Sequence, residues 1–388
     1  MAPITIVGSG LAGWTLAREL RKRDPDTPIA LVTADAGDFY AKPSLSNALA
    51  AGRSADQLVT TAAPKMAAQV GVELHVRRRV LSIDRGAHAL RTDAGELAYS
   101  RLVLALGADP IRLPIEGDAA ADVLSVNDLD DYRRLRARLS QQPREVAILG
   151  AGLIGCEFAN DLQLGGHRVT VLDPSPRPLA ALLPAPAGEA LAQRLQAAGV
   201  RWRFGDAVVE VAREAGRLRL RTRTGAVLTA DAVLSAVGLR PRTALAAGAG
   251  LAVQRGIVVD AFGASSDPDV FALGDCAQYE AGVMPYVMPI MAAARSIAAT
   301  LLGSPEPIRF GAMPIAVKTP ALPIAVVPAP AAGDGTWHNV GDATGVRMRY
   351  EASDGTLRGF VVAGDCYGER QALARALDIA PRATAEAA

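Results

Sequence analysis

Two stretches of the sequence, PITIVGSGLAG at residues 3–13 and EVAILGAGLIG at residues 145–155, repeat one pattern. In each, a short apolar run leads into Gly-x-Gly-x-x-Gly, and a helical pattern follows, at 14–23 and at 156–164. A further apolar run comes after each helix, at 28–33 and at 168–173. The chain therefore contains two β-α-β units that begin about 140 residues apart.

The spacing of the glycines has a mechanical meaning. The first glycine permits a tight turn, the second lets a pyrophosphate approach the backbone, and the third lets the helix pack closely on the strand. The diphosphate then lies at the helix N-terminus, where unpaired N–H groups and the helix dipole favour an anion. One triplet could be an ordinary tight turn, but two copies in strand–turn–helix context predict two dinucleotide sites. Their residues are Gly8, Ser9, Gly10, Leu11, Ala12 and Gly13 in the first copy and Gly150, Gly152 and Gly155 in the second.

The residue that closes the second strand separates the two sites. In the second copy it is Asp173, whose carboxylate can accept hydrogen bonds from ribose hydroxyls and would repel a 2′-phosphate. This favours NADH over NADPH, although the nearby Arg177 leaves NADPH open. The first copy has Thr33-Ala34-Asp35 there, with no acid at the usual point, so we expect less typical ribose binding.

Composition limits the possible classes of protein. A chain of 388 residues with 50% hydrophobic and 21% charged residues is expected to fold into two or three domains. With 41 basic against 40 acidic residues and only 4% aromatics, neither nucleic acid nor an anionic membrane is an expected partner.

Targeting and metal-binding signals are not expected either. The most apolar stretch, 283–302, holds two prolines and Arg295, so no membrane span is predicted. The first residues lack a basic region and a cleavage site, and we expect a cytoplasmic protein. The three cysteines lie far apart and the four histidines have no ligand spacing, so we expect no disulfide scaffold and no metal site. The last residues, 381–388, are expected to be disordered.

Three more segments share one design, an apolar strand that ends in a glycine turn. They are LVLALGADP at 102–110, VLSAVGLRP at 233–241 and VFALGDCA at 270–277. In this order, with the two glycine motifs, they resemble the two-dinucleotide-binding-domain flavoproteins of the glutathione-reductase-like fold. The resemblance implies an α/β chain with two Rossmann-like three-layer dinucleotide-binding domains and a small α+β C-terminal domain. The implied FAD domain is discontinuous, at 1–112 and 240–310, with an NAD domain at 113–239 and the C-terminal domain at 311–388.

The branch of the family is indicated by shorter motifs. The two cysteines of disulfide reductases are missing after the first β-α-β unit, where FYAKPSLS at 39–46 stands instead. That segment resembles the Y-x-(R/K)-P-x-L-S motif of flavin reductases that serve small iron proteins. GLIGCEFANDL at 152–162, YVMP at 286–289 and AVKTP at 316–320 are similar to rubredoxin–NAD reductases.

The resemblance implies a reaction and its partners. Hydride would pass from NADH to FAD, and single electrons would pass on to rubredoxin, a small acidic iron protein that feeds an oxygenase such as alkane hydroxylase. A first alternative is the ferredoxin reductase component of an oxygenase system. A second alternative is a flavoenzyme whose electron acceptor is oxygen, peroxide or nitric oxide, reduced directly or through a flavo-diiron partner protein. A third is a redox-sensing protein similar to apoptosis-inducing flavoproteins.

The resemblance also implies site residues. Lys42 is expected near flavin N5, Lys318 near the other ring edge, and Glu157 near the ring, paired with Lys42. These three are the expected catalytic residues, and two of them belong to only four lysines in the chain. The other residues expected at FAD are Thr33, Ala34, Val80, Asp275 and Val287: Asp275 would bind the ribityl chain, the Val287 backbone would face the flavin C2 carbonyl, and the Val80 backbone would meet adenine.

Overall fold

A computed structural model describes residues 2–139, 142–330, 333–341 and 345–377. The chain divides into two compact units. The first comprises Met1–Lys42, Asp56–Asp109 and Leu239–Phe310, and the second comprises the described residues of Pro43–Ala55, Pro110–Gly238 and Gly311–Ala388. The expected tail at 381–388 lies outside the described residues.

The first unit is built on a parallel sheet in the order β20-β9-β1-β2-β5. Its strands are β1 (Ile4–Val7), β2 (Ile29–Val32), β5 (Glu73–His75), β9 (Arg101–Leu104) and β20 (Val270–Ala272). The central strand β1 is buried along its whole length, which explains its continuous apolar sequence. Val7, its last residue, pairs with Val32 on one side and Leu104 on the other, so the carboxyl ends of three strands lie level.

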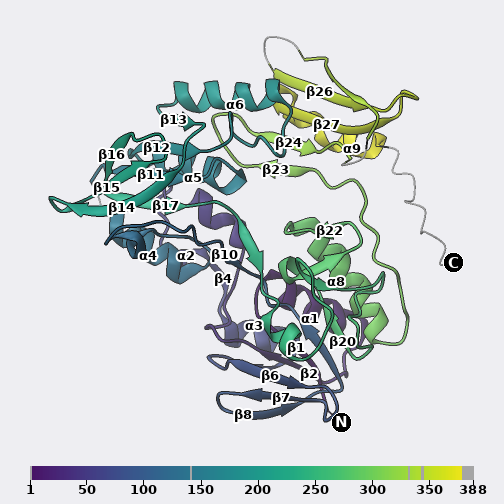
Figure 1. The fold of residues 1–388 in the computed structure, drawn as a ribbon. Coiled ribbons are helices and arrows are strands. Elements are labelled where there is room, and N and C mark those ends of the chain that lie inside the picture. The colour runs from purple at the N-terminus through teal and green to yellow at the C-terminus, as the bar shows by residue number, and fades with distance from the viewer. Residues whose placement is uncertain (1, 140–141, 331–332, 342–344, 378–388) are drawn as a thin grey trace. The chain divides into compact units, whose positions relative to one another are not determined.

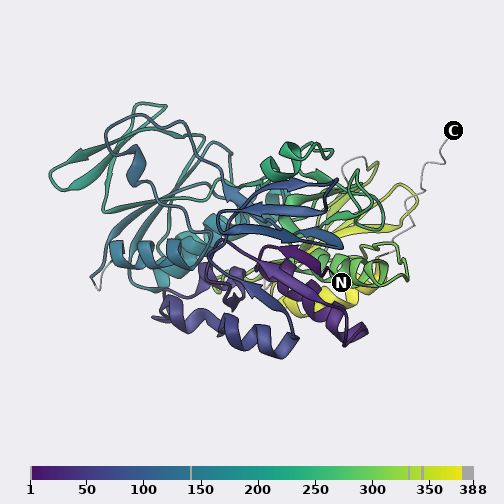
Figure 2. The same ribbon diagram turned by 90° about the horizontal axis from the view of Figure 1, so that it is seen from below.

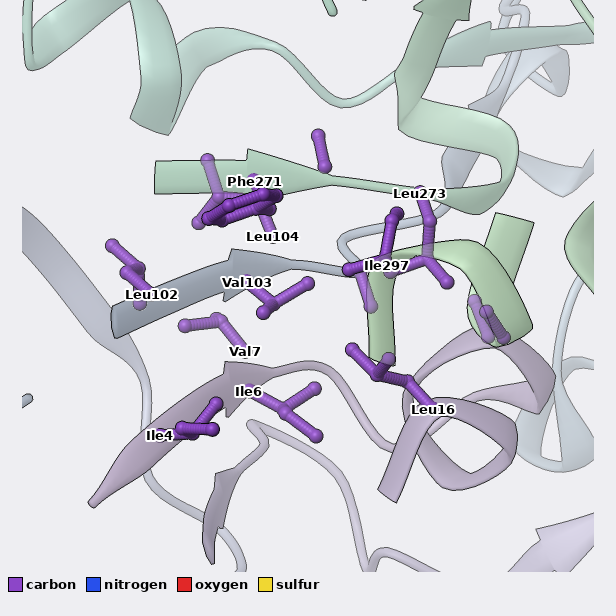
Figure 3. Packing of buried hydrophobic residues seen from close by; sticks show 14 of the residues in the cluster. Ile4, Ile6, Val7, Leu16, Leu102, Val103, Leu104, Phe271, Leu273 and Ile297 are labelled. Carbon is purple, nitrogen blue, oxygen red and sulfur yellow. The ribbon is translucent and has the colours of Figure 1, made fainter. Parts of the chain in front are cut away.

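Helices cover one side of this sheet and an antiparallel meander covers the other (Figures 1 and 2). The helices are α1 (Leu11–Arg23), α3 (Ala63–Val70) and α8 (Val287–Leu301), and the meander is β6 (Val80–Asp84), β7 (Ala89–Thr92) and β8 (Gly95–Ala98). Figure 3 shows side chains of β1, β9 and β20 meeting Leu16 of α1 and Ile297 of α8 in one core. This core fixes α1 and α8 beside each other.

Short elements complete the first unit and its connections. They are β3 (Phe39–Tyr40), η1 (Lys42–Asn47), α2 (Ala55–Leu58), β4 (Val59–Thr61), β10 (Ala108–Pro110), β18 (Leu239–Pro241), α7 (Ala244–Gly248), β19 (Ile257–Val258), η3 (Gly274–Cys276), β21 (Ala277–Tyr279) and β22 (Gly282–Val283).

The second unit repeats the architecture with a four-stranded parallel sheet, β13-β12-β11-β17. Its elements are η2 (Ala120–Asp122), α4 (Leu129–Leu139), β11 (Glu145–Leu149), α5 (Leu153–Leu164), β12 (Arg168–Asp173), α6 (Ala185–Ala197), β13 (Arg201–Phe204) and β17 (Ala232–Ser235), with the meander β14 (Val208–Glu214), β15 (Arg217–Thr222) and β16 (Val227–Ala230). The meander buries Leu218 and Leu220 against the sheet, while the alternating residues Arg217, Arg219 and Arg221 lie on the opposite, partly exposed face of β15.

An antiparallel sheet near the C-terminus belongs to the same unit. Its order is β23-β24-β27-β26-β25, made of β23 (Ile315–Val317), β24 (Ile324–Val327), β25 (Thr336–Asn339), β26 (Gly345–Glu351) and β27 (Leu357–Gly364), followed by η4 (Asp365–Glu369) and α9 (Arg370–Ala376). One face packs on α9 through Phe360 and Val362. The other face joins one apolar cluster with α5 and α6, to which Val326 and Val361 contribute. This shared core explains why the four-stranded parallel sheet and the C-terminal antiparallel sheet form one unit.

The predicted fold class is confirmed: the chain has two α/β dinucleotide-binding sheets and a small α+β C-terminal part. The units change at 109/110, 238/239 and 310/311, where the sequence proposed 112/113, 239/240 and 310/311. The short segment Pro43–Ala55, which the sequence assigned to the first domain, groups by its contacts with the second unit. Among the described helices, none combines the length and apolarity that a membrane crossing needs.

The turn after β1 generates a first prediction. Gly8 has φ +114°, and a Cβ built on it would lie 2.3 Å from the carbonyl oxygen of Ala105. Gly8→Ala should therefore strain the first unit by about 1–3 kcal/mol and lower its thermal unfolding midpoint. The matched control is Gly10→Ala, because a Cβ there meets nothing within 4 Å. Equal midpoints for the two variants, measured by calorimetry on protein freed of nucleotides, would contradict this account of the turn.

Candidate functional site

The first glycine loop lies at the carboxyl edge of the first parallel sheet. It joins β1 to α1, and side chains fix it from the neighbouring strand end. The Ser9 hydroxyl lies 3.0 Å from Thr33 Oγ1 and 2.9 Å from Asp35 Oδ1, and the Thr33 hydroxyl donates to the same carboxylate oxygen at 2.8 Å. Asp35 therefore reaches back to the loop, although it stands beyond the position where the sequence motif places an acid.

The N-terminus of α1 fits a diphosphate. The N-cap residue Gly10 makes no side-chain capping hydrogen bond, and the first N–H groups of a helix have no partner inside the helix. The place where a Gly10 side chain would stand is open, with nothing within 4 Å of a built Cβ. An anion can therefore approach the N–H groups of Leu11, Ala12 and Gly13 directly.

Asp275 lies against this loop. It follows Gly274, which has φ +77° and whose built Cβ would lie 2.9 Å from the Cβ of Ala12 in the first turn of α1. Burial raises the pKa of the Asp275 carboxyl, and the nearby Lys42 ammonium lowers it by a smaller amount. No hydrogen bond to this carboxylate comes from the described part of the chain. Asp275 therefore follows a turn that packs against the first turn of α1, and Lys42 is near enough to act on its charge. Their roles at FAD stay predictions.

The remaining residues expected at FAD occupy two further places in the first unit. The segment before Val80 is tied to the strand end, because the Arg78 N–H donates to the Thr33 carbonyl at 2.9 Å. Val287 is the first residue of α8, is 40% exposed, and follows an N-cap residue without a side-chain hydrogen bond. The N-terminus of α8 thus also lacks a side-chain cap, but its third residue, Pro289, has no N–H group to donate.

The second glycine loop repeats the first at the edge of the second sheet. The N-cap residue of α5 is Gly152, which has no side-chain cap and nothing within 4 Å of a built Cβ. The Asp173 carboxylate accepts the Ala151 N–H at 2.6 Å and the Ser175 N–H at 2.7 Å, so it holds the loop and the strand end together. Arg177 directs its guanidinium to the carbonyl of Leu183, 3.5 Å away.

A buried ion pair lies in the second unit. Glu157, on α5, has no exposed surface, while the Lys318 side chain, just after β23, is 39% exposed. Lys318 Nζ lies 3.0 Å from Glu157 Oε2, and the Lys318 N–H donates to Glu157 Oε1 at 2.9 Å. A charged group that is removed from water is stable only when it has an opposite charge and hydrogen bonds beside it. Lys318 supplies Glu157 with both, the charge from its ammonium group and a further hydrogen bond from its backbone N–H.

The segment around η1 completes the surroundings of this pair. The Ser46 hydroxyl donates to Glu157 Oε2, and Lys318 Nζ donates to the carbonyl of Pro43. The Asn47 amide fits best with its oxygen 3.1 Å from Lys318 Nζ and its nitrogen donating to the Lys318 carbonyl at 2.8 Å. Three stretches of chain, from η1, α5 and the end of β23, thus meet at one carboxylate.

The structure therefore brings two of the three expected catalytic residues into contact. The sequence paired Glu157 with Lys42; within its unit the carboxylate is paired with Lys318, and a pair with Lys42 would join the two units and stays a prediction. Sequence reasoning did not single out Ser46 or Asp161. Ser46 is the last residue of the motif quoted at 39–46, and Asp161 lies inside the motif at 152–162, so both carried a signal.

The cysteines take no part in this site. Cys156 and Cys276 are fully buried, Cys366 is 7% exposed, and none forms a disulfide. Burial raises the pKa of the Cys156 thiol, and it raises that of Cys276 to about 11. The described residues also contain no cluster of three or more metal-ligating side chains.

Two open, glycine-fronted helix N-termini, each at the carboxyl edge of a parallel sheet, form the arrangement with which α/β proteins bind dinucleotides. The chain belongs to the pyridine nucleotide-disulphide oxidoreductase family, whose model matches residues 2–296. A second model, the rubredoxin binding C-terminal domain, matches residues 307–377. The protein is accordingly an FAD-dependent oxidoreductase that uses a pyridine nucleotide.

Individual relatives agree with the family. The chain is 43% identical over 378 residues to a rubredoxin-NAD(+) reductase of Alcanivorax borkumensis, covering 97% of this chain and 99% of the relative. It is 39% identical to a nitric oxide reductase FlRd-NAD(+) reductase of Aeromonas hydrophila, covering 93% of each. A solved ferredoxin reductase for the CYP199A2 system of Rhodopseudomonas palustris has a TM-score of 0.86 and 29% identity, covering 94% of this chain and 91% of that one.

The burial of the thiols generates the second prediction. Because Cys156 and Cys276 are fully buried and burial raises their pKa values, these two thiols should not react in the native protein with an aromatic disulfide reagent at pH 8. All three cysteines should react once the chain is unfolded in guanidinium. Rapid labelling of a native thiol that also abolished electron transfer would bring a cysteine back into the chemistry.

Proposed function

We propose that this protein is an NADH:rubredoxin oxidoreductase that works in the cytoplasm and feeds an oxygenase such as alkane hydroxylase. The observation that supports the two cofactors is the pair of open helix N-termini, one in each unit. The choice of rubredoxin rests on the C-terminal sheet, since residues 307–377 match the rubredoxin-binding family model. Three buried cysteines without a disulfide suit a reducing compartment.

When bound, FAD accepts a hydride from the nicotinamide and releases electrons one at a time. The chain would bind the FAD diphosphate at Gly8–Gly13 and its ribityl chain at Asp275. The NADH diphosphate would lie at Gly150, Gly152 and Gly155. Asp173, whose oxygens are held in place by two backbone N–H groups, would accept the adenosine ribose hydroxyls and repel a 2′-phosphate.

Charged side chains would set the electrostatics. Lys42 and Lys318 would stabilise negative charge on the reduced ring, and Glu157 would hold Lys318 in place. Because Glu157 is fully buried while the Lys318 side chain is 39% exposed, their interaction is screened less than that of a surface pair and more than that of a pair buried on both sides.

The choice of acceptor is tested by steady-state turnover. Purified protein with FAD should reduce rubredoxin faster with NADH than with NADPH, and should reduce rubredoxin faster than a [2Fe–2S] ferredoxin. The rate with rubredoxin should fall as salt is added, because encounter with an acidic partner is electrostatically steered. Faster turnover with ferredoxin would favour the ferredoxin reductase alternative. Faster turnover with a flavo-diiron protein and nitric oxide would favour the second alternative.

Lys318→Met tests the proposed role of the ammonium. Loss of a positive charge near the reduced ring should lower the flavin reduction potential, because the anionic reduced form loses stabilisation. The potential is measured by spectroelectrochemistry, with Lys65→Met, an exposed lysine on α3, as the control. An unchanged potential in Lys318→Met would remove the proposed electrostatic role.

A further inference from the structure

Helix α5 carries more buried polar side chains than the proposed chemistry uses. Glu157 and Asn160 have no exposed surface, and Asp161 is 5% exposed. Glu157 and Asp161 are four residues apart and therefore share one helix face, where two like charges disfavour each other. Burial raises the pKa of the Asp161 carboxyl; hydrogen bonds from backbone N–H groups lower it by less, and the negative charge of Glu157 adds a smaller rise. Asp161 is thus retained at a cost, which indicates a specific task.

The contacts of Asp161 show what it holds. One carboxylate oxygen accepts the N–H of Leu49 at 2.8 Å and the other accepts the N–H of Ala50 at 3.1 Å. Within the described ranges, no lysine, arginine or histidine forms an ion pair with it. A carboxylate that accepts backbone N–H groups fixes the path of the chain, whatever side chains the segment carries.

The segment that Asp161 holds is the one that surrounds the buried ion pair. Ser46, three residues before Leu49, donates its hydroxyl to Glu157, and the Pro43 carbonyl accepts from Lys318 Nζ. The far end of the segment is fixed as well, because the Tyr132 hydroxyl donates to the Arg53 carbonyl at 2.8 Å. Between these anchors, Asp161 is the side chain of α5 that holds the segment by its backbone N–H groups.

We propose that Asp161 is a positioning residue for the Glu157–Lys318 pair and acts through Ser46. By holding the backbone at Leu49 and Ala50, it keeps the Ser46 hydroxyl on Glu157 and the Pro43 carbonyl on Lys318. Asp161 contacts neither of these charged groups and is placed at no cofactor. The kinetic part of the inference rests on the proposed function, whereas the structural part does not.

The variants are chosen to distinguish an effect on the position of Ser46 from a general loss of folding stability. Asp161→Asn keeps the shape of the side chain but turns an amide group toward one backbone N–H. Ser46→Ala removes only the hydroxyl through which Asp161 is proposed to act. The control is Asp231→Asn, because the Asp231 carboxylate also accepts a backbone N–H, that of Glu145 at 2.8 Å; unlike Asp161, it also pairs with Arg217 at 3.0 Å. Asp231 immediately precedes β17, at the amino edge of the sheet, away from the glycine loop.

The kinetic readout is flavin reduction by NADH in a stopped-flow instrument. Asp161→Asn should slow reduction about tenfold with KM for NADH nearly unchanged, because a small misplacement of charged groups affects the chemical step more than nucleotide binding. Ser46→Ala should have a similar effect, and the double variant should be no slower than the worse single variant. Multiplied effects in the double variant, or a change in KM alone, would overturn the proposal.

The second readout is independent of activity. Amide hydrogen exchange should show lost protection in Asp161→Asn at whichever of Leu49 and Ala50 faces the new amide group, and retained protection at both in Ser46→Ala and Asp231→Asn. Unchanged protection in Asp161→Asn would overturn the structural part directly. If the wild-type protein shows no reduction by NADH, the proposed function fails, and the exchange experiment still decides whether Asp161 positions the segment.

Discussion

A carboxylate that is taken out of water must find a cation and hydrogen-bond donors for both of its oxygens, and Glu157 imposes this constraint on the second unit. Its partners come from two remote stretches, at Ser46 and at Lys318. Leaving either oxygen without a partner would cost more than an ordinary hydrogen bond contributes. The packing of η1 and of the start of the C-terminal sheet against α5 is therefore set by polar contacts as well as by the apolar core.

Helix α5 links this constraint to the nucleotide site. Its first turn follows Gly152 and is open toward an anion, and its second turn carries Glu157. A rigid helix thus fixes the spacing between the place expected for the NADH diphosphate and the buried ion pair. In the second unit, one helix carries both the open N-terminus and a buried acidic side chain. In the first unit these lie on different elements: α1 supplies the open N-terminus, and Asp275 comes from a turn that packs against α1.

Local patterns made much of this predictable from the sequence. Two glycine triplets between apolar strands and helices determine the nucleotide-binding edges, because φ values such as +114° at Gly8 and the close approach of its Cα to Ala105 exclude other residues. Lys318 and Glu157 could be selected as site residues by motif, but their contact could not, because it depends on how the C-terminal sheet packs on α5. Asp161 lies inside a quoted motif, but its contacts could not be predicted from it, since its partners are backbone N–H groups that any residue supplies.

The short segment Pro43–Ala55 has a consequence for how such chains can be recombined. It is encoded within the first nucleotide-binding half, yet its backbone is held by Asp161, Tyr132 and Lys318. In a chimaera joined at the domain boundaries of the linear sequence, the segment Pro43–Ala55 would pack against the second unit of another protein. The buried Asp161 carboxylate would then lose the N–H groups that it accepts. An exchange of domains between family members therefore has to transfer Pro43–Ala55 together with the second unit.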